Sequence, residues 1–208
     1  MDNTEKLERG CAEDNLLSQS RSIVMLVDSI DDRFNEVVSY IEGAWNCRCL
    51  VVFSGVGKSG LVGQYLASCF NAIGVPSAFL HPTDAVHGDV GILQGAGVLI
   101  ALSVSGETKE LEPIINQVGY LGIPSYLITA GGDGCSLALQ VNATLPLARL
   151  PEIDPSGMLP LRASLMQMAL GNALVVAVAE RIGFNKDRLV ALHPGGSIGE
   201  KLRKEGAG

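Results

Sequence analysis

Short continuous apolar runs alternate along this chain with segments whose apolar residues recur every three or four positions. Five runs predict strands, at residues 49–53, 76–80, 98–102, 125–129 and, more weakly, 143–147. Three periodic segments between and after them predict helices, at 61–73, 111–120 and 160–181. A continuous apolar run is typical of a strand buried on both faces. The alternation therefore predicts an α/β fold, with a five-stranded parallel sheet flanked by helices.

Residues 13–45 precede the first strand and have helical periodicity. Their apolar positions are Leu16, Leu17, Ile23, Val24, Leu26, Val27, Ile30, Val37, Val38 and Ile41. The chain has 208 residues, 47% of them hydrophobic, which is enough for one buried core. No linker or repeat divides it. We therefore predict a single domain over 1–208, with an N-terminal helical segment (1–45) and an α/β core (46–203).

The net charge of −7 argues against a nucleic-acid partner, because phosphate contacts need a basic face. The five cysteines are odd in number and scattered, which indicates free thiols in a reducing compartment. The charged N-terminus has no apolar segment of a signal peptide, and no apolar run reaches about 18 residues. We expect a cytoplasmic protein without a membrane partner.

Ligands of parallel sheets bind at the carboxyl ends of the strands. The loops after the first four strands are therefore the candidates: 54–59, 81–89, 103–110 and 129–134. The first, Ser54-Gly-Val-Gly-Lys-Ser-Gly60, matches a dinucleotide fingerprint, but the second strand ends in His81 where a ribose-binding acid is expected. Val52 excludes a Walker loop, which needs glycine there. A generic anion site and a tight turn both remain open for this loop.

The third loop places three hydroxyls around a glycine, in Ser103-Val-Ser-Gly-Glu-Thr108. Hydroxyls and helix N-terminal amides together can bind a phosphate monoester with little positive charge. The alternative is a helix cap by Ser105 or Thr108. A cap needs one hydroxyl and not three, so we favour a phosphate site.

The two glycine- and serine-rich loops and His193-Pro-Gly-Gly-Ser197 resemble the signatures of the sugar isomerase (SIS) family. Together with Leu192-His-Pro-Gly-Gly-Ser-Ile-Gly199, the segment His81-Pro-Thr-Asp-Ala-Val-His-Gly-Asp89 resembles its arabinose-5-phosphate isomerase subfamily. The likeness runs from about residue 20 to 203 and implies a flavodoxin- or Rossmann-like three-layer sandwich. Most subfamily members continue into CBS domains, and this chain is similar to the shorter form without them.

This resemblance implies an aldose–ketose isomerase that interconverts D-arabinose 5-phosphate and D-ribulose 5-phosphate through an enediol(ate). The reaction needs a base, an acid or electrophile and a phosphate site, but no metal or organic cofactor. The family forms its sites between subunits, so the resemblance also implies a homo-oligomer, a dimer or tetramer, with shared active sites. The acidic N-terminal helix would suit an interface.

The resemblance also implies which residues are functional. The catalytic set is Lys58, Glu110, Glu152, His193 and His87, and the substrate- or phosphate-binding set is Ser54, Gly55, Ser59, Ser103, Ser105, Thr108 and Arg162. Lys58 would polarise the carbonyl, Glu152 is the candidate base, and His193 would transfer protons. Structural alternatives stay open, since His87 could cap or pack, Glu110 could favour a helix start, and Glu152 could be a solvated loop acid.

One segment departs from the family pattern. Where members have Pro-Thr-Ser-Ser-Thr, this chain has Pro160-Leu-Arg-Ala-Ser164, so hydroxyls are lost and a guanidinium is gained. Arg162 could contact phosphate or carboxylate, or it could be a surface residue. Two alternatives to the pentose isomerase follow: an isomerase of another phosphosugar, such as a hexulose or heptose phosphate, and a non-catalytic sugar-phosphate-binding regulator.

Overall fold

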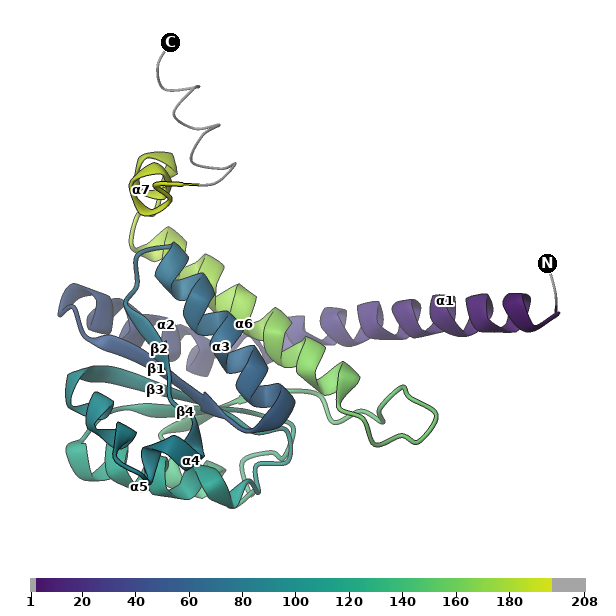
Figure 1. The fold of residues 1–208 in the computed structure, drawn as a ribbon, viewed down its shortest axis with the longest axis horizontal. Helices are drawn as coiled ribbons and strands as arrows, with labels where there is room; N and C mark the ends of the chain where they lie inside the picture. The colour runs from purple at the N-terminus through teal and green to yellow at the C-terminus, as the bar shows by residue number, and fades with distance from the viewer. Residues whose placement is uncertain (1–2, 196–208) are drawn as a thin grey trace, which may run out of the picture.

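A computed structural model describes residues 3–195 of the chain. Its core is one sheet of five parallel strands in the order β2-β1-β3-β4-β5 (Figure 1). The strands are β1 (Leu50–Gly55), β2 (Ser77–Phe79), β3 (Ala96–Leu102), β4 (Ser125–Thr129) and β5 (Ala143–Pro146). The predicted fold class is confirmed, and each predicted strand lies within two residues of an observed one.

Helices cover both faces of the sheet (Figure 1). On one face lie α2 (Asp32–Asn46), α3 (Gly57–Ala72) and α6 (Leu161–Arg181), and on the other α4 (Pro82–Ala85) and α5 (Glu112–Leu121). Side chains of β1 alternate between the two layers: Val51 and Phe53 pack under α2, α3 and α6, and Val52 packs toward α5. All three are fully buried, which is why the strand reads as one apolar run.

The strand order changes direction at β1. The chain leaves β1 through α3 to reach β2 on one side, and it later returns to β3 on the other side of β1. The loops that follow β1 and β3 therefore diverge, and such a switch point opens a crevice at the carboxyl ends of the strands. The two loops singled out in the sequence, 54–60 and 103–108, border this crevice.

The segment 13–45, predicted as helical, is helical but interrupted in its middle. The segment forms α1 (Asn3–Val24), a 3-10 turn η1 (Met25–Ser29) and then α2. The break occurs because the Asp31 carboxylate accepts hydrogen bonds from the amides of Arg33 and Phe34, and so caps a new helix.

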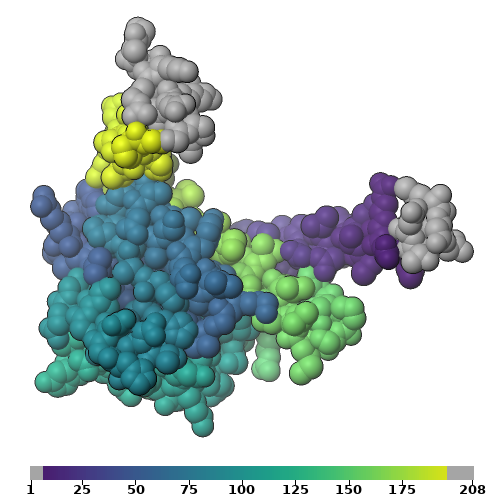
Figure 2. All heavy atoms as spheres, viewed as in Figure 1, coloured from purple at the N-terminus to yellow at the C-terminus, as the bar shows by residue number. Residues whose placement is uncertain are grey.

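Helix α1 projects from the body of the protein as an arm (Figures 1 and 2). Of the ten apolar positions in the predicted helix, six are exposed in the single chain, namely Leu16, Leu17, Ile23, Val24, Val27 and Ile30. The other four are buried in the core. Periodicity thus identified helix, but most of these apolar residues remain uncovered within one chain.

Helix α6 is the longest apolar helix of the described residues, and by length and composition it could cross a membrane. Its buried residues Leu170, Leu174 and Val178 belong instead to the core cluster that includes α2 and α3. Two further helices were not predicted, α4 and α7 (Lys186–Leu192). In α7 the Arg188 guanidinium lies 4.9 Å from the Trp45 ring centroid, which places α7 beside the end of α2 that precedes β1.

Candidate functional site

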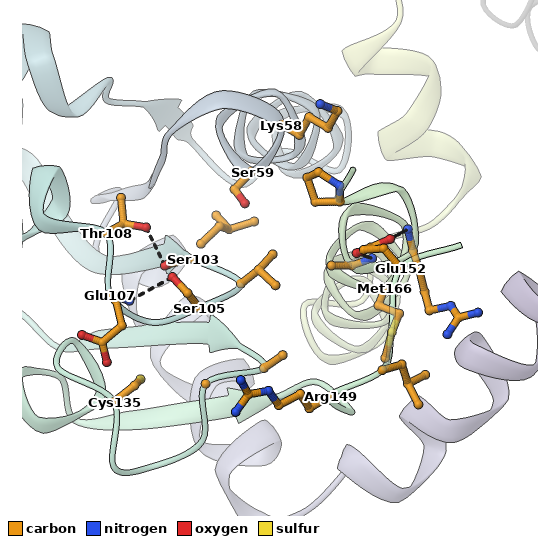
Figure 3. Close-up of a pocket in the computed structure, with 18 of the residues that line it drawn as sticks. Lys58, Ser59, Ser103, Ser105, Glu107, Thr108, Cys135, Arg149, Glu152 and Met166 are labelled. Carbon is orange, nitrogen blue, oxygen red and sulfur yellow. Dashed lines mark hydrogen bonds between the residues drawn. The ribbon is translucent and has the colours of Figure 1, made fainter. Parts of the chain in front are cut away.

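A cavity of about 790 Å³ lies at the carboxyl ends of the strands. The loops after β1, β3, β4 and β5 line it, together with the start of α6. Figure 3 shows Ser103, Ser105 and Thr108 on one side, Glu152 and Met166 on the other, and Lys58 and Ser59 between them. The cavity therefore brings together residues that are up to about a hundred positions apart in sequence.

The serine loop, residues 103–108, is organised by its own hydroxyls. Ser103 Oγ lies 2.7 Å from Thr108 Oγ1 and accepts a hydrogen bond from the Gly106 amide at 3.1 Å. Ser105 Oγ accepts from the Glu107 amide at 3.2 Å. Because the backbone amides donate to these oxygens, the hydroxyl protons of Ser105 and of one member of the Ser103–Thr108 pair stay available to an acceptor. The loop can donate to an anion.

Glycine at position 106 is required by this geometry. Its φ of +73° is unfavourable for other residues, and a Cβ there would lie 2.0 Å from Cys135 Sγ. The tight fit presses the serine loop against the loop after β4. The positions of the hydroxyls are consequently fixed before any ligand arrives.

Lys58 and Ser59 lie in the first turn of α3 and line the cavity. Val56, at the N-cap, offers no side-chain acceptor to the first amides of this helix. Those amides and the helix dipole favour an anion or a polarised oxygen at this end of the cavity. Lys58 is exposed and adds a positive charge.

Glu152 closes the opposite wall. Its two carboxylate oxygens accept hydrogen bonds from the backbone amides of Arg162 at 2.8 Å and Ala163 at 3.1 Å. These amides belong to the first turn of α6, and the residue before the helix, Pro160, provides no side-chain cap. Glu152 is therefore held in place at a helix N-terminus while it faces the cavity, which fixes its position relative to a ligand.

Arg162 belongs to the lining, but its guanidinium points out of the cavity. Nη1 donates to the Pro151 carbonyl at 2.7 Å, and Nη2 donates to Ser18 Oγ on α1. The buried Nε has no partner among the described residues. In the single chain this side chain therefore joins α1 to the start of α6 and offers no contact to a ligand in the cavity.

Arg149 was missed by the sequence analysis. It follows β5, lines the cavity and is exposed, and it makes no hydrogen bond or ion pair with another described residue. Figure 3 shows its side chain below the serine loop. The signal was available, since this cation is the second residue after a predicted strand, but the candidate ligand loops were taken only from the first four strands. With Lys58 it supplies positive charge to a cavity that also holds Glu107 and Glu152.

Glu107 is fixed at the rim of the serine loop. Its carboxylate accepts from the hydroxyl of Ser136 and, at 2.9 Å, from the Ser136 amide. The Ser136 hydroxyl, and secondly its amide, lower the pKa of Glu107 from its ordinary value. These contacts direct the Glu107 carboxylate toward the loop after β4.

Five predicted site residues do not line the cavity of this chain. Ser54 is buried and its hydroxyl donates to the Leu80 carbonyl at 2.7 Å, and Gly55 lets α3 approach β3 closely. Glu110 and His87 are exposed on neighbouring turns. His193 ends α7, where its Nδ1 lies 2.9 Å from the Leu189 carbonyl oxygen. Gly196 and Ser197 of that motif lie outside the described residues.

Metal-ligating side chains do not gather in the described part of the chain. No three His, Cys, Asp or Glu residues there are grouped so that they could hold an ion. The absence of a cofactor thus stays a prediction. What the cavity offers is an anion site of hydroxyls and amides, two cations, and a fixed carboxylate that could take up a proton.

Residues 45–177 match the SIS domain. Arabinose 5-phosphate isomerase KpsF of Escherichia coli is 34% identical over 188 residues, which cover 90% of this chain and 56% of that protein. Arabinose 5-phosphate isomerase KdsD of Escherichia coli O157:H7 is 37% identical over 156 residues, covering 75% of this chain and 47% of that protein. The chain thus spans about half the length of these relatives.

Solved structures have the same fold. A protein of Listeria monocytogenes superimposes with a TM-score of 0.84 and 26% identity, covering 94% of this chain and 100% of that one. Protein c3406 of Escherichia coli CFT073, solved in complex with arabinose 5-phosphate, gives a TM-score of 0.81 and 29% identity, covering 93% of this chain and 100% of that one.

Proposed function

The chain belongs to the SIS domain family, and from that premise we propose that it is a sugar-phosphate aldose–ketose isomerase. Its proposed reaction is the interconversion of D-arabinose 5-phosphate and D-ribulose 5-phosphate through an enediol(ate). The observation that carries the proposal is the cavity itself. In it the serine loop, which can donate hydrogen bonds to an anion, lies across from the fixed carboxylate of Glu152, and Lys58 lies between them. The relatives named for this activity and the structure in complex with arabinose 5-phosphate support the choice of pentose.

In this mechanism the phosphate binds to the serine loop, where Ser105 and one member of the Ser103–Thr108 pair donate their hydroxyl protons. This fixes the sugar so that C1 and C2 lie between Lys58 and Glu152. Glu152 takes the proton from one carbon and returns it to the other. Lys58 stabilises the negative charge that develops on the enediolate oxygen.

We further propose that the active protein is a homo-oligomer, a dimer or tetramer, whose sites are shared. His193 supports this. The cavity lies at the start of α6, whose 21 residues span about 30 Å at 1.5 Å each, and α7 follows the far end of that helix. Arg188 of α7 also packs on Trp45, which lies just before β1 and so at the amino ends of the strands, whereas the cavity lies at their carboxyl ends. His193 therefore has to come from a second copy if it is to act in this cavity.

A cytoplasmic location is also proposed. The five cysteines form no disulfide, and Cys11 and Cys47 are exposed. Exposed free thiols suit a reducing compartment.

A second candidate function is a non-catalytic sugar-phosphate-binding protein. It is favoured by one observation, that both oxygens of Glu152 are occupied by the first amides of α6 while His87, Glu110 and His193 lie outside the cavity of the chain. The phosphate site does not depend on any of these residues, so binding could persist without turnover.

A panel of phosphosugars separates these functions. Purified protein is mixed with D-arabinose 5-phosphate, a hexulose phosphate and a heptose phosphate, and both the melting temperature and the turnover are recorded. We expect stabilisation and turnover with the pentose. Stabilisation without turnover would identify a binding protein, and turnover only with a larger sugar would move the enzyme to another substrate.

A further inference from the structure

The peptide that carries the Glu152 side chain is held from one place only. Within residues 3–195, every hydrogen bond to Pro151 and Glu152 comes from the first turn of α6. The amides of Arg162 and Ala163 hold the two carboxylate oxygens, and the Arg162 guanidinium donates to the Pro151 carbonyl at 2.7 Å. Arg162 therefore binds both the carboxylate and the peptide group that precedes it.

The loop that follows Glu152 provides no second anchor. The Asp154 carboxylate accepts hydrogen bonds from the amides of Ser156 and Leu159, which belong to the same loop. Residues 155–159 are exposed. Because this part of the loop is closed on itself, the position of Glu152 depends on the start of α6 and on whatever holds the Arg162 side chain.

Helix α1 holds the Arg162 side chain. The second half of α1 lies along the start of α6 (Figure 1), and Arg162 Nη2 donates to Ser18 Oγ on α1. The guanidinium Nε is buried and has no partner among the described residues. An unpartnered buried donor costs stability, and a methionine would fill similar space without that cost. The contacts with Pro151 and Ser18 are thus what an arginine provides at this position.

We propose that Arg162 is a positioning residue: it joins α1 to the Pro151–Glu152 peptide and so holds the Glu152 carboxylate in place for proton transfer. The inference deepens the proposed function and rests on it for the proton transfer. It gives Arg162 a role in the reaction without a contact to the ligand. It also makes the base depend on α1, the arm whose apolar residues the proposed homo-oligomer covers.

Steady-state kinetics with D-arabinose 5-phosphate test the catalytic part. We expect Arg162→Met to lower kcat about ten- to hundredfold and Ser18→Ala about three- to tenfold, because a displaced base reacts more slowly. KM should stay within about twofold, since no ligand contact is lost. The double variant should be no slower than Arg162→Met, because Ser18 acts through Arg162. In a Glu152→Gln background, Arg162→Met should lower kcat no further.

Hydrogen–deuterium exchange tests the structural part without any turnover. Ser18→Ala leaves the start of α6 unchanged in sequence, yet it should speed exchange at the amides of Arg162 and Ala163 about three- to tenfold. Arg181 is the matched control, since it also joins α6 to another helix, through Glu42 of α2. Arg181→Met should change neither kcat nor the exchange of these two amides.

Light scattering separates positioning from assembly. Ser18→Ala should keep the wild-type mass while its kcat falls, and a mass that falls in step with kcat overturns the proposal. So does a raised KM with unchanged kcat in Arg162→Met, an equal further loss in the Glu152→Gln background, or unchanged amide exchange in Ser18→Ala. A wild-type protein without turnover contradicts the isomerase activity instead, and the exchange measurement still decides whether Arg162 holds Glu152.

Discussion

At the scale of single residues, the cavity combines hydroxyls that can donate hydrogen bonds with a carboxylate that is held in one position. The serine loop was predicted from sequence because its three hydroxyls directly follow a strand. The sequence did not reveal Arg149 as a lining residue, because the loop after the weak fifth strand was not counted. It could not reveal the contact of Arg162 with Ser18 either, since a contact between residues 144 positions apart depends on how α1 lies along the start of α6.

Glu152 is the residue whose substitution tests the chemistry. Glu152→Gln keeps an oxygen that can accept from the first amides of α6, but it removes the group that takes up the proton. We expect kcat to fall by about 10²- to 10⁴-fold with KM within a few-fold, as for loss of a general base. Steady-state kinetics and a melting curve on the same preparation measure the two effects.

Asp154 offers a control in the same loop, because its carboxylate accepts from the Ser156 and Leu159 amides and does not line the cavity. Asp154→Asn should leave kcat close to that of the wild type. Equal losses in the two variants would mean that the loop, and not the Glu152 base, had been damaged.

Arg149 should contribute charge to ligand binding. Arg149→Gln is expected to weaken D-arabinose 5-phosphate binding about three- to tenfold and to reduce its dependence on salt, because an exposed guanidinium acts through a screened field. Titrations at two salt concentrations check this. Arg181, paired with Glu42 at the far end of α6, is the control, and Arg181→Gln should not change the affinity. An affinity of Arg149→Gln equal to that of the wild type at low salt would exclude the role.

At the scale of elements, the strands and the bounds of α5 and α6 were predicted to within two residues, and the break between α1 and α2 was not predicted. A strand buried on both faces has an apolar residue at every position, and this is visible without a structure. The break between α1 and α2 depends on one capping aspartate within a continuous periodic pattern, so periodicity alone missed it. The short helices α4 and α7 are too brief to show a period.

Asp31 should stabilise the start of α2 in a pH-dependent way. Its pKa is lowered, first by the hydrogen bond from the Arg33 side chain, so its contribution is present above its unfolded pKa near 3.8 and is lost as the pH falls through the lower folded value. Asp31→Ala should cost about 1 kcal/mol at neutral pH through loss of the cap.

Asp31→Asn separates cap from charge, since an amide still accepts from the Arg33 and Phe34 amides. Urea unfolding from pH 7 downward should show this variant less stable than the wild type at neutral pH, with the gap closing below about pH 4. A gap that stays constant across this range would show that ionisation of Asp31 contributes nothing.

At the scale of the whole molecule, the single chain leaves two features without a partner: the apolar residues of α1 and a predicted catalytic histidine far from the cavity. In the proposed homo-oligomer, a second copy of the chain covers the apolar residues of α1 and brings its own His193 to the cavity. Sequence predicted shared sites through resemblance, but the separation of His193 from Glu152 follows from the length of α6 and the packing of α7.

Substitution on α1 tests the assembly. Leu16 is 67% exposed, so Leu16→Glu should leave the single chain folded and weaken association, with activity falling in parallel. Light scattering after size exclusion measures the mass, and Glu13→Gln on the same helix is the control. A Leu16→Glu variant of wild-type mass, or a wild-type protein that is fully active as a monomer, would contradict a shared site built on α1.

The central claim is isomerisation through an enediol(ate), and deuterium uptake tests it most directly. D-Arabinose 5-phosphate is incubated with the purified chain in deuterated water and followed by NMR, beside Glu152→Gln. We predict formation of D-ribulose 5-phosphate with deuterium entering at C1, and at C2 of the re-formed aldose, for the wild type but not for the variant. A wild-type protein that binds the sugar phosphate and yet yields neither ketose nor deuterium at C1 or C2 would contradict the account.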